Sequence, residues 1–405
     1  MRPAVVTPLD DHMGLDIARS LAAHGISVYG LDSDGRVAGR FSKCCRFVKC
    51  PSLEREGEEG YIKFLADFAN KLGEKPVLYP VSDRHVLLCS RHRVLLNNFY
   101  DYVMPDYDLV EKLTTKDGLQ AIAQEFKIPA PKTFSINNSK EMDQIAGHIS
   151  YPALLKPTES TYWHDPKISR LLRRGLFNGR AKVIPCRNAR ELVEAYRLIA
   201  ARDDRLIVQE VIPGEDHRLF YVAFYLDRHS RPLGAFAGRK YRIIPSGFGS
   251  ASYVRSFQDS ELHETAIRIL RAIGYQGLGG LEFKKDPRDG VYKLIEFNTR
   301  FGMWDGLGVR CGIDLPYIAY RDASGLPVEP QFRYRENIIW IDWQRDLRAA
   351  LEYWRKHQLT IAQWLVSLRG EKMSAIYSKD DWKPGAAFTL SLIGKMWGRL
   401  VTKTH

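Results

Sequence analysis

The chain has 405 residues, of which 45% are hydrophobic, 27% charged and 11% aromatic. At about 150 residues per domain this length predicts two or three domains, and the apolar content excludes a disordered chain. No run of about 20 apolar residues is present, which excludes a membrane-spanning helix, and the first residues lack the pattern of a secretory signal. We therefore expect a cytoplasmic protein whose six cysteines are reduced.

The net charge is +12, from 60 Lys and Arg against 48 Asp and Glu. A basic surface attracts anions in general, including nucleic acid, acidic lipid and phosphorylated small molecules. The charge is spread along the chain, with only a mild excess at the C-terminus, so it does not choose among these partners.

Residues 1–105 alternate between strand and helix patterns. Three apolar runs and one helical pattern carry this alternation, at 4–6, 26–32 and 75–80 for the strands and at 15–22 for the helix. The alternation predicts a Rossmann-like domain with a parallel sheet. The first strand-to-helix turn holds only Gly14, so the three-glycine dinucleotide fingerprint is absent and no nicotinamide or flavin is expected here.

Residues 106–330 mix helices with strands and form the second predicted domain. The expected elements are a helix within 106–135 capped by Thr114 or Thr115, strands at 151–157 and 205–212, a helix at 188–201, and a hairpin of 279–285 with 291–300. The hairpin turn at 286–290 has Asp, Pro and Gly, the residues that favour turns.

Polar side chains on the hairpin predict a metal site. Alternation along a strand puts Glu296, Asn298 and Arg300 on one face. A turn centred near residue 288 places Glu282 opposite Leu294 and diagonal to Glu296, about 7 Å away, a distance that a cation can bridge. Carboxylate and amide oxygens are the hard ligands that Mg²⁺ requires. The alternative is a solvated strand face that happens to be polar.

The motif Glu-Phe-Asn-Thr-Arg at 296–300, preceded by Glu282 on a paired strand, resembles the metal-binding signature of the ATP-grasp superfamily. Three further stretches extend the resemblance over roughly residues 1 to 330, namely 115–117 with 128–133, 152–157, and 209–216. The similarity is greatest to the carboxylate–amine-ligase-like and carbamoyl-phosphate-synthase-like members, including those resembling D-aspartate ligase.

The resemblance implies ATP and Mg²⁺ as cofactors, with two metal ions and Mn²⁺ as an alternative metal. The resemblance also implies that Lys116 and Lys156 contact phosphates and that a hinge near 209–216 receives the nucleotide. The adenine and ribose contacts fall on Gln209, Glu210, Ile212 and Asp216, and Leu294 is a candidate apolar wall beside adenine. The metal ligands fall on Glu282, Glu296 and Asn298.

Substrate groups are expected in two places. Arg239, Lys240 and Arg242 can hold an acyl phosphate or a substrate carboxylate, and Arg300 can steady the acyl phosphate. Ser82 and Asp83 follow the strand at 75–80, where open α/β sheets bind ligands, and Asp83 can accept from an amine. The alternatives are a helix cap for Asp83 and solvated charges for the arginines.

The stretch 158–180 departs from the family pattern. Many members have a glycine-rich loop over the phosphates here, whereas this chain has only Gly175 and Gly179 together with four arginines, Arg170, Arg173, Arg174 and Arg180. Two interpretations stay open: the arginines cover the phosphates, or the stretch is a solvated basic loop.

The expected fold class is thus α/β and α+β, with a Rossmann-like pre-ATP-grasp domain at 1–105, an ATP-grasp domain at 106–330 and a basic, helical C-terminal extension at 331–405. The tail at 384–405 has the pattern of a basic amphipathic helix. It is expected to dock on its own domain or a dimer mate, with contact to the inner membrane surface as the alternative.

The predicted function is an ATP-dependent carboxylate–amine ligase that works through an acyl phosphate and releases ADP and phosphate. The partners are a small carboxylate and an amine, with no nucleic acid, and a homodimer stays open. Two alternatives remain: an enzyme that activates bicarbonate for carbamoylation or carboxylation, and a basic protein that binds nucleic acid or membrane without turnover.

Overall fold

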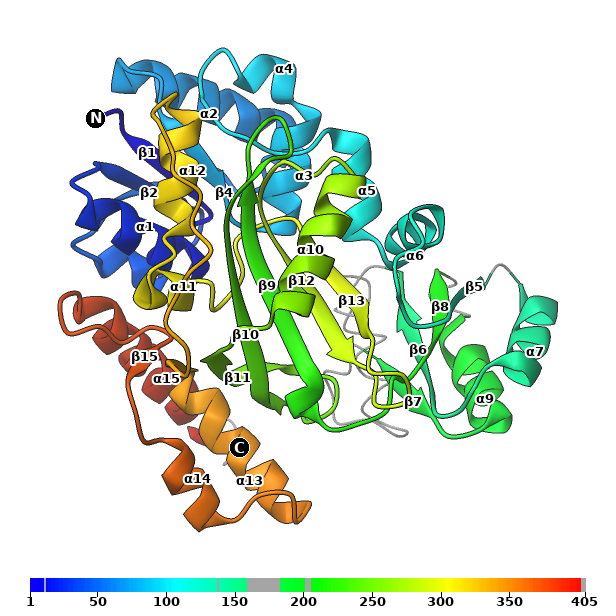
Figure 1. The fold of residues 1–405 in the computed structure, drawn as a ribbon. Coiled ribbons are helices and arrows are strands. Elements are labelled where there is room, and N and C mark those ends of the chain that lie inside the picture. The colour runs from blue at the N-terminus through cyan, green and yellow to red at the C-terminus, as the bar shows by residue number, and fades with distance from the viewer. Residues whose placement is uncertain (11, 137, 159–182, 201–204, 402–405) are drawn as a thin grey trace.

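The computed structural model describes residues 1–10, 12–136, 138–158, 183–200 and 205–401. Three sheets organise these residues (Figure 1). The N-terminal sheet, the large central sheet and a small sheet lie side by side, and the C-terminal helices lie below the N-terminal sheet in this view.

The N-terminal sheet is parallel, with the order β3-β2-β1-β4. Its elements are β1 (Ala4–Thr7), α1 (Met13–Ala23), β2 (Val28–Asp32), η1 (Ala38–Phe41), β3 (Arg46–Lys49), α2 (Gly57–Leu72), β4 (Val77–Pro80), α3 (Asp83–Arg91) and α4 (Arg93–Leu96). The central strand β1 is fully buried, as its apolar sequence requires in a parallel sheet. The predicted parallel domain is therefore confirmed. The strand order reverses between β1 and β4, which makes their carboxyl ends the natural ligand crevice.

The small sheet is antiparallel, with the order β5-β8-β6-β7. Its elements are β5 (Thr133–Ile136), α7 (Ser139–His148), β6 (Ala153–Pro157), β7 (Ile184–Cys186), α9 (Ala189–Ala200) and β8 (Leu206–Glu210). Apolar residues of α7 and α9 pack with the sheet in a core of their own, which includes Met142, Leu155 and Leu192.

Two helices lead into the small sheet where one was expected. They are α5 (Tyr107–Thr114) and α6 (Lys116–Glu125). Thr115 separates them because it is extended, and its hydroxyl accepts from Gly118 N as the N-cap of α6. The predicted cap at Thr115 is thus confirmed, and it also ends the preceding helix.

The central sheet has seven strands in the order β13-β12-β9-β10-β11-β14-β15. Its strands and the helices that follow them are β9 (Leu219–Leu226), β10 (Pro232–Ile244), β11 (Ser250–Ser256), α10 (Ser260–Ala272), β12 (Gly277–Lys285), β13 (Tyr292–Asn298), α11 (Gly306–Cys311) and α12 (Leu315–Ala323). The largest hydrophobic core joins this sheet, α10 and α12 to the N-terminal sheet.

The C-terminal extension is only partly helical, which corrects the expectation. Its elements are β14 (Ile339–Ile341), α13 (Trp343–Arg355), α14 (Ile361–Ser367), β15 (Lys372–Ser374) and α15 (Lys383–Val401). β14 pairs with β11, and β15 pairs with β14, so the extension completes the central sheet. The helix α15 docks on the same chain, because Phe388 packs against Leu15 and Ala38. None of the described helices is long and apolar enough to cross a bilayer.

Candidate active site

Two carboxylates face each other on the central sheet. Glu282 on β12 pairs directly with Glu296 on β13, whereas Phe283 pairs with Leu294, so Ile295 is an extra residue in the ladder. The expected diagonal arrangement is therefore wrong: next to the turn, where Lys285 pairs with Tyr292, the register is already one residue from the expected one, and this β-bulge adds a second residue. The bulge brings the two glutamates into direct opposition, where Cβ atoms are about 4.5–5.5 Å apart. Asn298 lies two positions beyond Glu296 on the same strand face.

A buried lysine neutralises one of these carboxylates. Lys240 on β10 is 6% exposed, and its Nζ lies 2.5 Å from Oε2 of Glu282. Lys240 therefore lies beside the predicted metal ligands and forms an ion pair with one of them. No group of three or more His, Cys, Asp or Glu side chains within the described ranges is arranged to hold a metal ion. The predicted set has two carboxylates and one amide, so that finding does not test it.

The two predicted phosphate lysines converge from different elements. Lys116 begins α6, and its Nζ lies 3.5 Å from the carbonyl oxygen of Thr158, just beyond β6. Lys156 on β6 donates from Nζ to Oε1 of Gln209 on β8, 2.6 Å away. Burial lowers the pKa of Lys156 to about 8, helped by Lys116 and opposed by Glu296 and Glu282. Both lysines and both glutamates therefore act electrostatically on one region.

The predicted adenine residues line the end of β8. The Nε2 of Gln209 donates to Thr133 Oγ1 at 2.9 Å, and Oε1 of Glu210 accepts from Lys132 N at 3.1 Å. Ile212 is 4% exposed. Arg288, from the β12–β13 turn, reaches within 3.7 Å of Glu210 Oε2 and so links the small sheet to the central one. No sequence pattern singled out Arg288.

Leu294 does not share the face of the two glutamates. It pairs with Phe283, which lies on the opposite face from Glu282, and it is 2% exposed in the large core. The bulge at Ile295 again explains the difference, because it shifts the alternation between Leu294 and Glu296. We therefore withdraw Leu294 as a wall of the nucleotide site.

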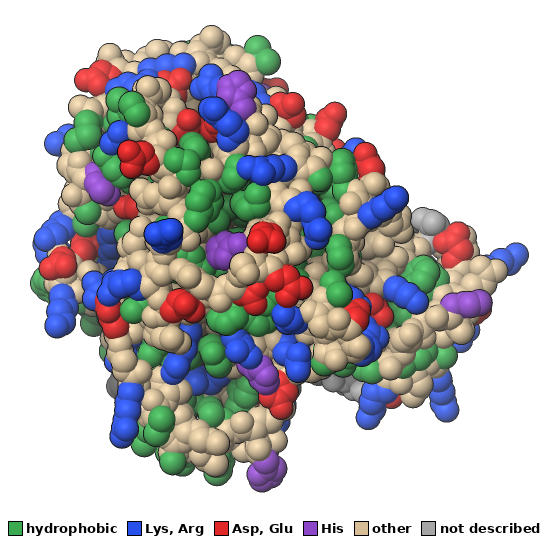
Figure 2. Space-filling view, viewed as in Figure 1, with side chains coloured by type: hydrophobic (Ala, Val, Ile, Leu, Met, Phe, Trp, Pro, Cys, Tyr) green, Lys and Arg blue, Asp and Glu red, His purple; other side chains and the backbone are tan. Residues whose placement is uncertain are grey.

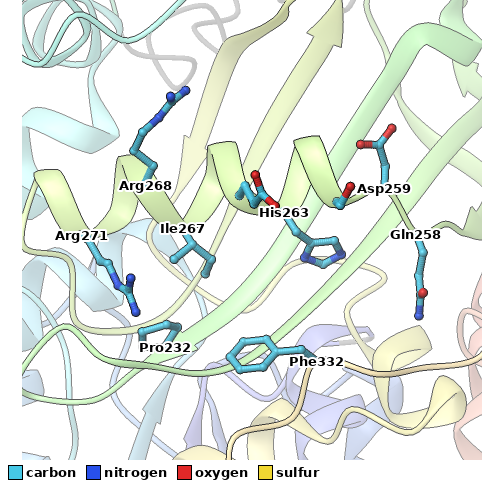
Figure 3. Close-up of a pocket in the computed structure, with 10 residues that line it drawn as sticks. Pro232, Gln258, Asp259, His263, Ile267, Arg268, Arg271 and Phe332 are labelled. Atoms are coloured by element: carbon cyan, nitrogen blue, oxygen red, sulfur yellow. The ribbon is translucent and has the colours of Figure 1, made fainter.

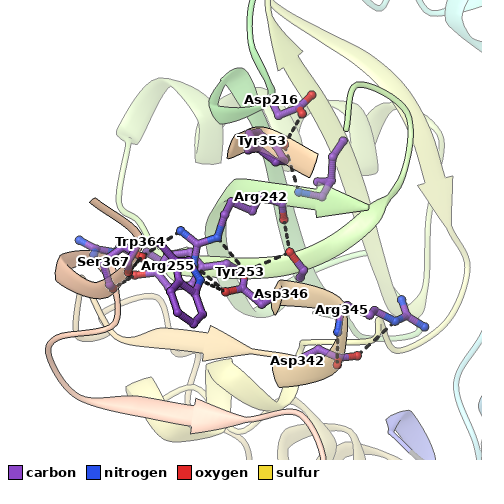
Figure 4. A network of polar contacts seen from close by, with 12 residues as sticks. Asp216, Arg242, Tyr253, Arg255, Asp342, Arg345, Asp346, Tyr353, Trp364 and Ser367 are labelled. Carbon is purple, nitrogen blue, oxygen red and sulfur yellow. Dashed lines mark hydrogen bonds and ion pairs between the residues drawn. The ribbon is translucent and has the colours of Figure 1, made fainter. Parts of the chain in front are cut away.

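Asp216 is held by the C-terminal extension (Figure 4). It begins the short helix η3 (Asp216–Arg218) and is 8% exposed. Its Oδ2 accepts from Gly247 N at 2.9 Å and from the hydroxyl of Tyr353 on α13. Sequence reasoning missed Tyr353, because residues so far apart along the chain leave no local pattern.

The guanidinium of Arg242 is bound by residues of the C-terminal extension (Figure 4). Its guanidinium donates to both oxygens of Asp346, at 2.7 and 2.9 Å, and to Ser367 Oγ at 2.9 Å. A register shift next to Tyr241 turns Arg242 to the face of Tyr253, opposite to Lys240. The expected substrate contact therefore finds no support, because these donors already bind the extension.

Arg239 also points away from the carboxylate pair. It pairs with Phe220, and Phe220 pairs with Phe283 on the face opposite Glu282. Its Nε donates to the carbonyl oxygen of His217 at 2.6 Å. Among the three basic residues expected on β10, only Lys240 lies on the face of the glutamates.

Arg300 and Asp83 meet at the crevice of the N-terminal sheet. Nε of Arg300 lies 3.0 Å from Oδ1 of Asp83, and Asp83 begins α3 just after β4. Ser82 is the N-cap of α3, so the helix cap that the alternative assigned to Asp83 falls on its neighbour. Ser82 Oγ also lies 2.7 Å from Nδ1 of His85, whose pKa is lowered to about 4 by burial and by Arg84. His85 is therefore neutral near pH 7.

A cavity lies away from the predicted site residues. It has a volume of about 730 Å³ and follows α10, where His263, Ile267 and Phe332 line it (Figure 3). None of the predicted site residues lines this cavity. The predicted basic stretch at 158–180 falls outside the described residues beyond Thr158.

Comparisons with known proteins show what this chain is similar to. A family model described as the carbamoyl-phosphate synthase L chain, ATP binding domain, matches residues 250–330, which contain the carboxylate pair. D-aspartate ligase of Enterococcus faecium is 26% identical over 299 residues, which cover 71% of this chain and 68% of that protein. A carbamoyl phosphate synthase large chain of Hyperthermus butylicus is 24% identical over 229 residues, but these cover only 19% of that protein.

Solved structures share the fold. The biotin carboxylase domain of Hydrogenobacter thermophilus 2-oxoglutarate carboxylase, solved with MgADP and bicarbonate, matches with a TM-score of 0.60 at 18% identity, covering 84% of this chain and 73% of that one. L-amino acid ligase of Bacillus licheniformis matches with a TM-score of 0.56 at 16% identity, covering 81% of this chain and 75% of that one. At identities this low, the matches show a shared fold alone.

Proposed function

We propose that the chain is an ATP-grasp protein and that it is an ATP-dependent carboxylate–amine ligase. The observation that carries the proposal is the direct opposition of Glu282 and Glu296, whose charges act on Lys156 of the small sheet together with that of Lys116 at the start of α6. Opposed acids and converging cations together suit a metal-bound polyphosphate, because each set neutralises a different part of it.

Magnesium fits the donor set. Two carboxylates in direct opposition repel each other, and a divalent cation removes that repulsion. Glu282, Glu296 and Asn298 would supply the oxygen ligands for Mg²⁺, with Mn²⁺ as an alternative. When bound, the cation would neutralise the charge that develops on the phosphates.

The chain's own groups bind and orient the reactants. Lys116 and Lys156 would hold the polyphosphate, and the residues Gln209, Glu210, Ile212 and Asp216 would hold the nucleoside. Lys240 limits the charge of Glu282, which keeps one carboxylate oriented on the sheet. Arg300 would hold the acyl phosphate, and Asp83, with its side chain 51% exposed, would accept from the amine.

The proposed reaction has two displacements. A carboxylate oxygen of the substrate attacks the γ-phosphorus of ATP, the bond to the β-phosphate oxygen breaks, and ADP leaves. The amine nitrogen then attacks the acyl carbon, the bond to the phosphate oxygen breaks, and inorganic phosphate leaves with the amide formed. Positioning and charge stabilisation supply most of the catalysis in such a scheme.

The ligase is favoured over bicarbonate activation by the extent of the similarity. The D-aspartate ligase match covers 68% of that protein, whereas the match to carbamoyl phosphate synthase covers 19%. A basic protein that only binds nucleic acid is disfavoured, because the opposed glutamates would repel phosphate unless a cation is present.

Hydroxylamine trapping tests the proposal. Hydroxylamine replaces the amine and converts an acyl phosphate to a stable hydroxamate. We expect the wild-type protein with Mg-ATP and a pool of amino acids and small carboxylates to form a hydroxamate together with ADP. Glu296→Gln should lose this activity by at least about a hundredfold, because it removes one of two opposed ligand charges at constant size.

The matched control is Glu329→Gln, which changes an exposed glutamate far along the chain from the hairpin. It should keep full activity. Hydroxamate formation that is equal in wild type and Glu296→Gln would contradict the assigned site. ADP formation that depends on bicarbonate alone would replace the ligase by the bicarbonate-activating alternative.

A further inference from the structure

The helix α13 has a second apolar face that is partly exposed. Its inner face packs on the protein through Ala349, Ala350 and Tyr353. Its outer face carries a row of four large apolar side chains, which we call the α13 stripe: Trp343, Leu347, Leu351 and Trp354, with Leu347 60% exposed and Trp354 49% exposed. Spacings of four, four and three residues place these side chains on one side of a helix.

The next helix extends this apolar surface. Ile361, Leu365 and Val366 on α14 are each more than half exposed. α14 is anchored beside α13, because Trp364 Nε1 donates to Asp346 Oδ2 at 2.9 Å. Burying large apolar side chains is favourable, so two exposed rows in neighbouring helices predict a partner surface.

Basic residues border the α13 stripe. On a helical wheel, Arg348 and Arg355 follow directly after Leu351 on the solvent side. Neither has an ion pair with a carboxylate among the residues that the structure describes, and both are exposed. Within 331–405 there are 13 Lys and Arg against 7 Asp and Glu. The α13 stripe is therefore bordered by two exposed arginines in a segment with excess positive charge.

We propose that the outer faces of α13 and α14 bind an anionic lipid surface. Tryptophan and leucine side chains suit the boundary between headgroups and acyl chains, and flanking arginines attract anionic headgroups. The position of the helices allows this contact, since α13 and α14 lie at the lower edge of the molecule, away from the small sheet (Figure 1). Figure 2 shows hydrophobic and basic side chains together on this lower lobe.

A second copy of the chain is a poorer occupant. A two-fold contact would bring the α13 stripe against itself and would set Arg348 and Arg355 near their own copies. Like charges at short range oppose such a contact, whereas an anionic surface is attracted by them. Charge complementarity therefore favours lipid.

Vesicle co-sedimentation with the full chain tests the proposal. We expect the wild type to sediment with vesicles that contain phosphatidylglycerol, to remain in solution with pure phosphatidylcholine, and to bind less as salt rises. The double variant Leu347→Glu with Leu351→Glu should weaken binding at least about tenfold, because it places two negative charges in the stripe. Both positions are exposed, so the fold should be kept, and the thermal midpoint checks this.

Val94→Glu is the matched control. Val94 on α4 is 89% exposed and lies outside the extension, so this variant adds the same kind of charge elsewhere and should bind like the wild type. Three results would overturn the proposal: no sedimentation of the wild type with anionic vesicles, equal loss in Val94→Glu, or binding that the double variant keeps. A concentration-dependent dimer that the double variant abolishes, without lipid binding, would assign the surface to a second copy.

Discussion

The surroundings of Lys156 shift its pKa. Burial, and to a smaller extent Lys116, lower its pKa to about 8, although Glu296 and Glu282 favour the charged form. In the nucleotide-free protein the charged fraction therefore falls from about nine-tenths at pH 7 to about one-tenth at pH 9. A phosphate partner needs the charged form, so deprotonation works against nucleotide binding as the pH rises.

We predict that the Kd for ATP at saturating Mg²⁺ rises about tenfold between pH 7 and pH 9. At the higher pH, Lys156 is neutral in most protein molecules and must regain a proton before it can hold a phosphate. Lys156→Arg is the control, since a guanidinium stays charged over this range. Its Kd should change little with pH. Equilibrium binding of ATP at pH 7 and pH 9 measures this change in Kd. If the Kd changes equally with pH in the wild type and in Lys156→Arg, Lys156 does not contact the phosphates.

At the residue scale, the sequence predicted which residues belong to the site better than it predicted the sheet face on which each side chain lies. Lys116, Lys156, Gln209 and the two glutamates come together as expected, because their motifs keep order and spacing. The contacts of Arg242 and the core position of Leu294 could not be predicted. Each follows from an extra residue in a strand, which moves a neighbouring side chain to the other face of the sheet and leaves no mark in composition or periodicity.

At the element scale, α13 connects the C-terminal extension to the predicted nucleotide residue Asp216. The hydroxyl of Tyr353 donates to Oδ2 of Asp216 and accepts from Ile243 N at 3.3 Å. We expect Tyr353→Phe to raise the KM for ATP about tenfold or more and to leave kcat within about twofold, because a buried hydrogen bond to a carboxylate contributes about 1.5–3 kcal/mol.

Tyr377→Phe is the control in the same extension, since its hydroxyl contacts only Thr389 Oγ1 among the described residues. It should leave both constants unchanged. A lower thermal midpoint in Tyr353→Phe with an unchanged KM would mean that Tyr353 only stabilises the fold and does not position Asp216.

Short elements were the hardest to predict. The strands β14 and β15 have three residues each, too few for an alternating pattern to stand out, yet they tie the extension to the central sheet. The longer strands and helices were found because their apolar periodicity extends over several turns or pleats. The break between α5 and α6 rests on one capping residue, Thr115.

At the scale of the whole molecule, a buried carboxyl joins the N-terminal domain to the loop after β13. Asp16 on α1 is 4% exposed, and its oxygens have no hydrogen-bond partner within the described chain. A Cβ added at Gly306 would lie 2.3 Å from its Oδ2, so the carboxyl presses against the start of α11. Burial raises the pKa of Asp16 to about 8, with Asp10 and Asp305 adding to the effect and Arg19 opposing it.

This pKa predicts that stability falls as the pH rises. Between about pH 4 and pH 8 the folded state keeps the proton on Asp16 while the unfolded state has lost it, so each step up in pH favours unfolding. Asp16→Asn imitates the protonated form. We expect it to match the wild type in thermal midpoint at pH 5 and to exceed it by several degrees at pH 8.

Asp67→Asn provides the comparison, because Asp67 is an exposed carboxylate on α2. Its difference from the wild type should not depend on pH. If Asp16→Asn lowers the midpoint equally at both pH values, the carboxyl of Asp16 is ionised in the fold and the pH effect has another source.

The measurement that tests the central claim most directly is the nucleotide product formed from Mg-ATP with pooled carboxylates and amines. Wild type, Glu296→Gln and Glu329→Gln are compared under identical conditions. A carboxylate–amine ligase with the proposed site predicts ADP and phosphate from wild type and Glu329→Gln, only when both pools are present, and almost none from Glu296→Gln. AMP and pyrophosphate instead of ADP, or equal ADP from Glu296→Gln, would contradict the proposed acyl-phosphate ligase.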